Sequence, residues 1–207
     1  YYKLIRNIDN INIDTKNENI KYIPVGSIEF VLDFYKEYYN INNIKPINIP
    51  NKLMKESFLK RKIVEDANKT NLKRVFVKSK DKLKEYTDIV DIENIPKNKN
   101  LLISEVIDIE SEWRCFVYNK KILDIRNYSG EFDIFPDMKL IKKMIEEYDN
   151  SPVSYTIDVG INNNGTFVIE VHHFFSCGLY GFSDYKYLLN MFITTHNEII
   201  NGFYDEK

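Results

Sequence analysis

Apolar positions recur with different periods in different segments of the chain, and the changes of period mark the expected elements. Residues 1–25 hold short apolar runs separated by Asn and Asp, which predicts short strands that include Tyr22–Val25. The apolar positions of Ile28–Tyr39 have helical spacing, and Ser27 in front of them is a suitable N-cap, so we expect a helix there. Residues 40–52 contain two prolines and several asparagines and indicate a loop.

The next part of the chain alternates between weak and clear patterns. A lysine-rich connection over 55–70 leads to the compact strand Arg74–Lys78. The polar segment 79–100 shows no clear period. Leu101–Ile107 is apolar and rich in residues that favour strands, so a second strand is expected there.

Two hairpins and two helices are predicted in the C-terminal half. The hairpins pair Trp113–Tyr118 with Ile122–Tyr128 around Asn119-Lys120, and Val153–Gly160 with Thr166–His173 around Asn162-Asn163-Asn164-Gly165. The helices run from Pro136-Asp137 to about Tyr148, and from a Ser183 cap to about Ile200. This order predicts an α+β fold in which helices pack on antiparallel hairpins.

The composition excludes several classes of protein. The 207 residues carry a formal net charge of -2, and no apolar run approaches membrane-spanning length, so neither a nucleic-acid nor a membrane partner is expected. No signal peptide is visible, and two cysteines, Cys115 and Cys177, do not make a secreted disulfide framework. We therefore expect a reducing, cytoplasmic setting in which both thiols pack as small apolar side chains.

Strand alternation gathers candidate metal ligands on one face of the last hairpin. Asp158 falls on the polar face of its strand, and Glu170 and His172 fall on a face that also includes Thr166 and Val168. Two carboxylates on neighbouring strands form the usual start of a Mg²⁺ site. Alternation alone favours a plainer interpretation, in which Asp158 is a solvated acid near the turn and Glu170 is a charge at a sheet edge.

Three cations are candidates for phosphate contacts. Arg114 alternates with apolar neighbours in the first hairpin, and Arg126 shares a face with Asp124 across the turn. The planar guanidinium suits phosphate oxygens, and Lys78 at a strand end can reach into a cleft as a compact cation. Each also has an ordinary alternative. An arginine in this hairpin can form a cross-strand ion pair with Glu112 or Asp124, and Lys78 can be an ordinary lysine at the end of a strand.

Five short motifs follow one another along the chain. They are Val75-Phe76-Val77-Lys78, Ser104-Glu105-Val106-Ile107, Glu112-Trp113-Arg114-Cys115-Phe116-Val117, Ile157-Asp158-Val159-Gly160 and Val168-Ile169-Glu170-Val171-His172. In order and approximate spacing they resemble the motifs of ATP-grasp enzymes. The chain is most similar to a small clade with one arginine and two lysines in the nucleotide site, over residues 70–185 closely and 20–60 loosely.

The resemblance implies an ATP-grasp fold, in which antiparallel sheets with packed helices hold a nucleotide between two subdomains. Residues 69–207 would form this domain, and residues 1–68 would form a small α/β portion in front of it. The implied cofactors are ATP and Mg²⁺. The implied substrates are a carboxylate and an amine, either small molecules or peptides.

The resemblance also implies which residues hold the nucleotide. Lys78 would contact the ATP phosphates, and Lys84 would be the second lysine of the clade. Glu105, Val106 and Ile107 would form the hinge that meets adenine, largely through backbone groups.

Three further residues take roles from the same resemblance. Glu112 would bind the ribose, Arg114 would bind phosphate, and Arg126 would face the transferred phosphate. The expected catalytic residues are therefore Arg126, Arg114 and Lys78.

The implied metal site holds the main departure from the family pattern. Asp158 and Glu170 would bind Mg²⁺, and His172 stands where related sites carry Asn. Imidazole suits softer ions than Mg²⁺, so Mn²⁺ is an alternative for a set of Asp158, Glu170 and His172. In addition, Ser79 replaces the usual proline after the lysine, and no glycine occurs between that strand and the hinge.

Three functions remain open at this point. The resemblance favours an ATP- and Mg-dependent carboxylate–amine ligase that acts on an amino acid or peptide through an acylphosphate. The departures allow a weakened ATP-binding module that serves as a sensor or partner-binding domain. A zinc site of His172, His173, His196 and Cys177 is the third alternative, although adjacent histidines on a strand face opposite ways and no close-spaced ligand motif occurs.

Overall fold

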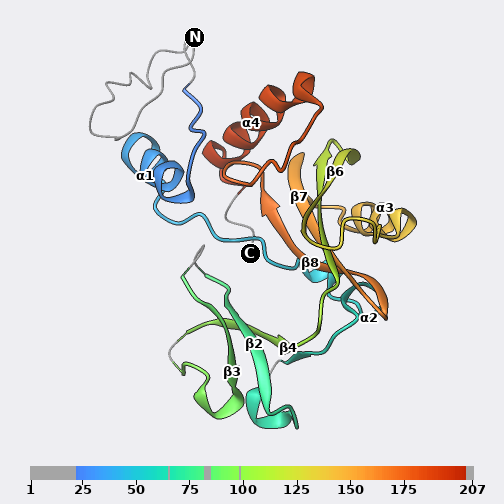
Figure 1. Cartoon of the computed structure of the whole chain (residues 1–207). Coiled ribbons are helices and arrows are strands. Elements are labelled where there is room, and N and C mark those ends of the chain that lie inside the picture. The colour runs from blue at the N-terminus through green and yellow to red at the C-terminus, as the bar shows by residue number, and fades with distance from the viewer. Residues whose placement is uncertain (1–21, 65, 82–84, 98, 204–207) are drawn as a thin grey trace.

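The computed structural model of the chain describes residues 22–203 apart from 65, 82–84 and 98. The described residues form two four-stranded sheets with the strand orders β1-β4-β2-β3 and β6-β5-β7-β8. Every neighbouring pair of strands in both sheets is antiparallel. Figure 1 shows the smaller sheet below the larger one, with the helices grouped around the larger sheet.

The smaller sheet contains two strands, at 63–64 and 87–91, that the polar and apolar pattern did not predict. Its strands are β1 (Ile63–Val64), β2 (Arg74–Ser79), β3 (Thr87–Asp91) and β4 (Leu101–Glu105). β3 lies within the polar segment 79–100, and nearly all of its residues are exposed, so it carries no alternation to find. Val75 and Val77 of β2 are fully buried and form the centre of this sheet's core.

The larger sheet consists of the two predicted hairpins. Its strands are β5 (Ser111–Tyr118), β6 (Lys121–Gly130), β7 (Ser154–Asn162) and β8 (Gly165–His173). Asn119 and Lys120 form the first turn with φ of 49° and 62°, which are the two positive values that a type I′ hairpin turn needs. Gly165, at φ 91°, supplies the positive φ of the second turn.

Helices cover the larger sheet on both sides. The α-helices are α1 (Ile28–Tyr39), α2 (Glu56–Leu59), α3 (Met138–Glu147) and α4 (Tyr185–Ile200). Short 3₁₀ helices occupy Asn51–Leu53, Ala67–Lys69 and Ile92–Asn94. None of the helices in the described ranges is long and apolar enough to cross a membrane.

Two of the three predicted helix starts are confirmed. Ser27 caps α1 by accepting a hydrogen bond from the Phe30 amide, and Asp137 caps α3. The predicted Ser183 cap is wrong, because the Ser183 hydroxyl donates to Asp124 and α4 begins one residue after Asp184. The strand predicted at Tyr22–Val25 is also wrong, and the strands predicted before it lie outside the described residues.

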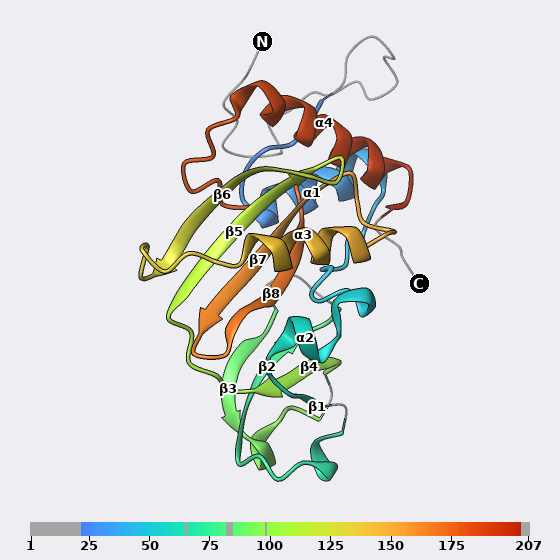
Figure 2. The same cartoon turned by 90° about the vertical axis from the view of Figure 1, so that its right-hand side faces the viewer.

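One face of the larger sheet is apolar and packs against α3, as Figure 2 shows. Ile141, Met144 and Ile145 of α3 are buried against sheet residues such as Cys115 and Ile157. Full burial of one such side chain stabilises the fold by about 1.5–3 kcal/mol, so this contact fixes the helix and the sheet against each other. The opposite face points toward the smaller sheet and is covered only in part, by α4.

The α+β class with antiparallel sheets and packed helices is therefore confirmed. β1 precedes residue 69 in the sequence, yet it pairs with β4 of the smaller sheet at Ile63↔Ser104 and Val64↔Ile103. The division of the chain into 1–68 and 69–207 remains a prediction.

Candidate functional site

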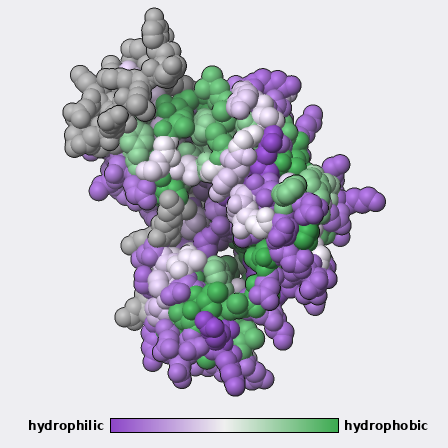
Figure 3. Space-filling view, viewed as in Figure 1, coloured by the Kyte–Doolittle hydropathy of each residue, from purple (hydrophilic) through white to green (hydrophobic). Residues whose placement is uncertain are grey.

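A cavity of about 730 Å³ lies between the two sheets. Its walls come from β2, β3 and β4 of the smaller sheet, and from β5 and β8 of the larger one. The segment 46–49 and the segment after β8, up to Tyr180, close its other sides. In the space-filling view the molecule is hollowed between its lower and upper parts (Figure 3). The volume falls in the range of small-molecule and cofactor pockets.

A row of four charged residues runs across the larger sheet on the face toward this cavity. Arg126 of β6 is opposite Arg114 of β5, Arg114 is opposite Asp158 of β7, and Asp158 is opposite Glu170 of β8. Directly opposed residues on antiparallel strands have Cβ atoms only about 5 Å apart, so neighbouring members of the row lie close together. Residues that are dispersed in the sequence thus become one line of charged groups.

The centre of the row is a buried ion pair. Nε and one terminal nitrogen of Arg114 donate to the two oxygens of Asp158 at 2.8 and 2.7 Å, and the other terminal nitrogen donates to the Gly178 carbonyl at 3.2 Å. Both side chains are almost completely buried. Burial alone would raise the pKa of Asp158, but the hydrogen bonds from Arg114 and the neighbouring His172 ring hold it below its usual value. The carboxylate is therefore ionised and already neutralised by an internal cation.

Three potential metal ligands meet beside this pair. One ligand atom each from Asp158, Glu170 and His172 lies within 4.8 Å of the others. Nε2 of His172 is 3.0 Å from Oε1 of Glu170 and 3.4 Å from Oδ2 of Asp158. Burial lowers the pKa of His172, while Asp158 raises it in part, so the neutral imidazole is favoured.

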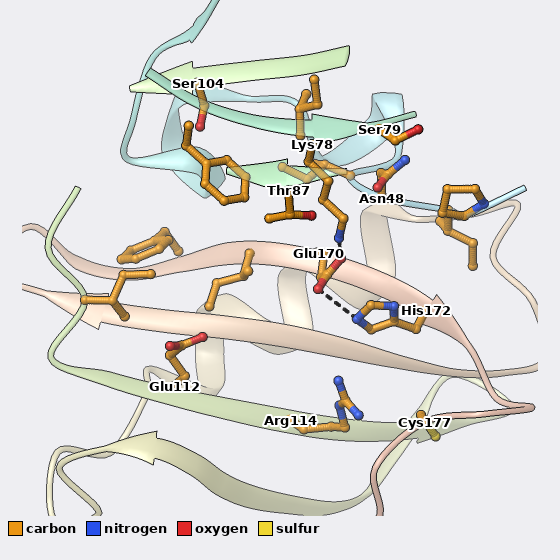
Figure 4. Close-up of a pocket in the computed structure, with 18 of the residues that line it drawn as sticks. Asn48, Lys78, Ser79, Thr87, Ser104, Glu112, Arg114, Glu170, His172 and Cys177 are labelled. Atoms are coloured by element: carbon orange, nitrogen blue, oxygen red, sulfur yellow. Dashed lines mark hydrogen bonds and ion pairs between the residues drawn. The ribbon is translucent and has the colours of Figure 1, made fainter. Parts of the chain in front are cut away.

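Lys78 joins the two sheets across the cavity. Its ammonium group donates to Glu170, so a strand end of the smaller sheet is tied to the candidate metal ligands of the larger sheet (Figure 4). Burial lowers the pKa of Lys78 to about 8, although Asp158 raises it in part. The strand-end lysine thus points into the cleft, as its position predicts.

This cluster fits a divalent cation. Nε2 of His172 is buried and forms no hydrogen bond of good geometry with any described residue, although two carboxylates are adjacent. An imidazole lone pair next to two carboxylates is a donor set for Mn²⁺ or Mg²⁺, with Mn²⁺ favoured by the nitrogen ligand. Among the described residues no other group of three His, Cys, Asp or Glu residues has its ligand atoms this close.

A bulge in β8 changes the face assignment that simple alternation predicts. Val159 pairs with Val168, whereas its neighbour Asp158 pairs with Glu170, so Ile169 is an extra residue in β8. Val168 consequently faces the apolar core, and Phe167 faces the cavity opposite Gly160. The prediction that Thr166 and Val168 share a face with Glu170 and His172 is therefore wrong, because the bulge reverses the order of sides.

Arg61 was not singled out from the sequence, yet it contacts this bulge directly. One of its terminal nitrogens donates to the carbonyl of Val168 at 2.7 Å and to that of Leu59 at 3.3 Å, and the other donates to the carbonyl of Ile169 at 3.3 Å. Its guanidinium also lies 5.6 Å from the centre of the Phe167 ring. In the sequence, Arg61 is indistinguishable from the lysines on either side of it.

Gly160 is a second residue that the sequence analysis left aside. A Cβ atom at this position would lie only 2.5 Å from Cζ of Phe167, so the ring occupies the space that any other residue would fill. A glycine in the interior of a strand often marks such a close approach, and this signal was available in the sequence.

The expected hinge and ribose residues all line the cavity. Glu105, Val106 and Ile107 lie at the end of β4 and just after it, where the chain passes from one sheet to the other. The Glu105 carboxylate accepts a hydrogen bond from the Lys62 amide at 3.1 Å. Glu112 accepts a hydrogen bond from the Tyr128 hydroxyl at 2.9 Å, so its carboxylate is held at the cavity wall.

Two tyrosines that were not predicted enclose the buried arginine. The rings of Tyr128 and Tyr180 stack with their centres 5.1 Å apart, and the guanidinium carbon of Arg114 lies 5.6 and 5.1 Å from them, respectively. Aromatic faces attract a guanidinium, so both rings hold Arg114 in place beside Asp158. No local pattern links these positions before the chain is folded.

Two of the predicted cations cannot be placed in the cavity. Arg126 donates to Asp124 at 2.8 and 3.0 Å and is not among the lining residues. The structure thus contains the ion pair with Asp124 that the sequence analysis gave as the ordinary alternative to a phosphate contact. Lys84 lies outside the described residues.

The zinc alternative has no support in the geometry. His196 is buried between α1 and α4, where the hydroxyl groups of Tyr35 and Tyr39 lie 3.1 and 3.4 Å from its two ring nitrogens. It therefore lies in a different core from the residues of the cavity. Burial raises the pKa of the Cys177 thiol to about 12, so this cysteine is a neutral side chain at the cavity wall.

Several solved structures are similar to this chain. D-alanine–D-alanine ligase from Bacillus anthracis matches with a TM-score of 0.50 and 14% identity, over 83% of this chain and 76% of that chain. The same ligase complexed with ATP matches with 0.47 and 16%, over 72% of this chain and 63% of that one. A RimK domain protein ATP-grasp from Sphaerobacter thermophilus matches with 0.43 and 14%, over 70% of this chain and 59% of that one.

These similarities bear on the fold alone, because the identities are low. This chain also spans less than two thirds of the ATP-complexed ligase. No curated protein matches the sequence. The family model that matches is an ATP-grasp domain, family 2 of the clade named for one arginine and two lysines, and it covers residues 58–190, more than half of the chain. The predicted resemblance is thereby confirmed, and the protein belongs to the ATP-grasp superfamily, in family 2 of this arginine-and-two-lysine clade.

Proposed function

We propose that the protein is an ATP- and Mg-dependent carboxylate–amine ligase that acts through an acylphosphate. The observation that carries the proposal is the convergence of Lys78 with the cluster of Asp158, Glu170 and His172 on one cavity of an ATP-grasp domain. A triphosphate and its metal need such a combination of cations and hard ligands, and phosphoryl transfer relies on positioning and charge stabilisation more than on a protein nucleophile.

The cavity has two ends with different chemistry. Ser104, Glu112 and the hinge line one end, and Asn48 and Cys177 line the opposite end, with Lys78 and Glu170 between them (Figure 4). We assign the hinge end to adenine and ribose. The triphosphate then extends toward Lys78, and the substrates enter from the far end.

In the proposed reaction a substrate carboxylate oxygen attacks the γ-phosphorus, and ADP leaves with the electrons of the broken P–O bond. The amine then attacks the acyl carbon, phosphate leaves, and the amine nitrogen loses its proton. Lys78 would balance the charge on the transferred phosphate, and Asp158, Glu170 and His172 would hold the metal. A bound Mg²⁺ or Mn²⁺ would polarise the phosphate oxygens.

The ion pairs of the cavity imply an exchange of partners when the nucleotide binds. Lys78 is bonded to Glu170, and both oxygens of Asp158 accept from Arg114. Phosphate would replace Glu170 as the partner of Lys78, and the released carboxylate would then be available to the metal. Lys78 and Glu170 would each keep a partner of opposite charge in this exchange, so neither charge would be left unpaired in the cavity.

The direct test measures nucleotide turnover. The chain is incubated with Mg-ATP and pooled amino acids, with hydroxylamine added in a parallel series to trap an acylphosphate as a hydroxamate. We expect ADP release that depends on one pool, and a loss of about a hundredfold or more in Lys78→Met, since one preorganised charge contributes on this scale. Lys143→Met, which removes an exposed lysine of α3, is the matched control. Tight ATP binding without ADP release from any pool would contradict the proposal.

One observation favours a second candidate, an ATP-binding module without turnover. Both oxygens of Asp158 accept from Arg114, and Arg126 is paired with Asp124 outside the cavity, so these two arginines already have carboxylate partners within the protein. For this alternative, ATP would raise the melting temperature of the protein and no acceptor would release ADP.

A further inference from the structure

The bulge in β8 decides which residues of that strand reach the cavity. If β7 and β8 kept the regular register set by Val159 and Val168, Asp158 would be opposite Ile169, and Glu170 would be opposite Ile157 in the apolar core. A shift of one residue turns every side chain of a strand to the other face. The extra residue at 169 is therefore what brings Glu170 opposite Asp158 and, two residues later, His172 opposite Thr156.

This bulge lies on an edge strand. β8 is the outermost strand next to β7, so its outer backbone groups have no strand of the sheet as a partner. Two residues from the N-terminal part of the chain bind this edge instead. The Asn48 carbonyl accepts from the Val171 amide at 2.6 Å, and Arg61 donates to the carbonyls of Val168 and Ile169. Both contacts flank the position where the register changes.

Arg61 is suited to holding an irregular backbone. Its fork binds two consecutive carbonyls at once, and its position near the Phe167 ring adds a contact with the residue before them. Among the residues that the structure describes, it has no carboxylate within ion-pair distance, so backbone carbonyls are its polar partners. In a regular strand consecutive carbonyls alternate between the two edges, whereas at this bulge Arg61 binds those of Val168 and Ile169 together.

We propose that Arg61 is a positioning residue of the nucleotide and metal site: by binding the carbonyls of Val168 and Ile169 it holds the bulge that turns Glu170 and His172 toward the cavity. Arg61 also lines the cavity, but in this role it acts through the backbone of β8 and not by contact with a substrate or metal. The inference builds on the metal site of the proposed function, and it makes a separate statement about the backbone of β8.

The test compares Arg61→Met, Arg61→Lys and, as matched control, Arg74→Met. Arg74 is exposed and its carboxylate partner, Asp91, is also on the surface, so the control removes an arginine far from the bulge. Two quantities are measured on folded protein well below the melting temperature. The first is the exchange rate of backbone amides in 167–171, and the second is Mn²⁺ binding in the presence of ADP, followed by electron paramagnetic resonance.

We expect Arg61→Met to increase amide exchange in 167–171 by about tenfold or more, with β5 unchanged. We also expect Mn²⁺ affinity to fall by about 10–100-fold, as for other residues that orient metal ligands. Arg61→Lys, which keeps one donor group without the fork, should restore part of both. A residue with a purely stabilising role would lower the melting temperature and leave both quantities unchanged.

Each outcome bears on the proposal. Unchanged exchange and Mn²⁺ affinity in folded Arg61→Met would overturn it. If that variant does not fold, Arg61→Lys carries the same comparison. If the wild-type protein binds no Mn²⁺, the proposed metal site fails, and the amide exchange of 167–171 still decides whether Arg61 holds the bulge.

Discussion

Two adjacent rows of residues cross the same four strands of the larger sheet and differ in almost every property. One row, Ile125–Cys115–Ile157–Val171, is apolar and packs against α3. The next row, Arg126–Arg114–Asp158–Glu170, is charged and faces the cavity. The apolar row tolerates many side chains of suitable volume, whereas each member of the charged row needs a specific partner. The comparison teaches that one sheet supplies stability on one face and chemistry on the other.

The largest effect is expected from breaking the charged row at its centre. Asp158→Asn removes the anion that neutralises Arg114 and leaves a buried cation with a weaker partner, so the free energy of unfolding should fall by about 3–5 kcal/mol. Denaturant titration measures this change. The double variant Arg114→Met/Asp158→Leu should recover most of the loss, because an apolar pair needs no charge balance. A single variant as stable as the wild type would show that the pair is not buried.

On the apolar row, the corresponding test is Met144→Ala. Met144 of α3 is fully buried against this row, and its truncation should lower the free energy of unfolding by about 2–5 kcal/mol. In contrast to Asp158→Asn, the folded variant should bind Mn²⁺ and ADP with unchanged affinity, which equilibrium titration measures. A weakened metal site in Met144→Ala would mean that the two faces are not independent.

A smaller effect is expected at Gly160, where the sheet has no room for a side chain. Gly160→Ala places a methyl group against the Phe167 ring and should cost about 1–3 kcal/mol of stability through overpacking. Because Phe167 lines the cavity, ATP affinity should fall as well, by about tenfold, which corresponds to about 1.4 kcal/mol. The cycle with Phe167→Leu isolates the clash, and the double variant should regain much of the stability. Additive losses would place the cause elsewhere.

The smallest effect is the pH dependence of the charged row. The folded pKa of Asp158 is depressed, so its contribution to stability is present above the unfolded pKa of about 3.9 and is lost as the pH falls through the lower folded pKa. One group can add at most about 1.4 kcal/mol per pH unit to this slope. Unfolding curves of wild type and Asp158→Asn between about pH 5 and about pH 2 should therefore converge in metal-free buffer. Parallel curves would contradict the assignment.

Much of the fold could be predicted because its periods are clear. The helix at Ile28–Tyr39, both hairpins and the helix after Asp137 follow from apolar spacing and caps, and the structure confirms them. β3 could not be found, because an exposed edge strand needs no alternation. The faces of β8 were predicted correctly for Glu170 and His172 and wrongly for Val168, since nothing in the local pattern shows a bulge.

The candidate site was predictable as a set of residues and not as a set of contacts. Family resemblance and alternation selected Lys78, Asp158, Glu170 and His172, which the structure brings to one cavity. Their catalytic and metal roles remain predictions. Arg61 lies 107 residues from its carbonyl partner Val168 along the chain, and such a pair has no signature in a single sequence.

By itself the sequence determined most of the strands and the three longer helices, which positions are apolar, and which family the motifs resemble. These properties depend on residues that are close in the sequence, because their spacing sets the face of the helix or strand on which each side chain lies. Only the tertiary structure decided that Lys78 pairs with Glu170, that Arg114 neutralises Asp158, and that Arg61 contacts the bulge beside the candidate metal ligands. Register and long-range pairing follow from the free energy of the whole packed molecule, and a local period does not contain that information.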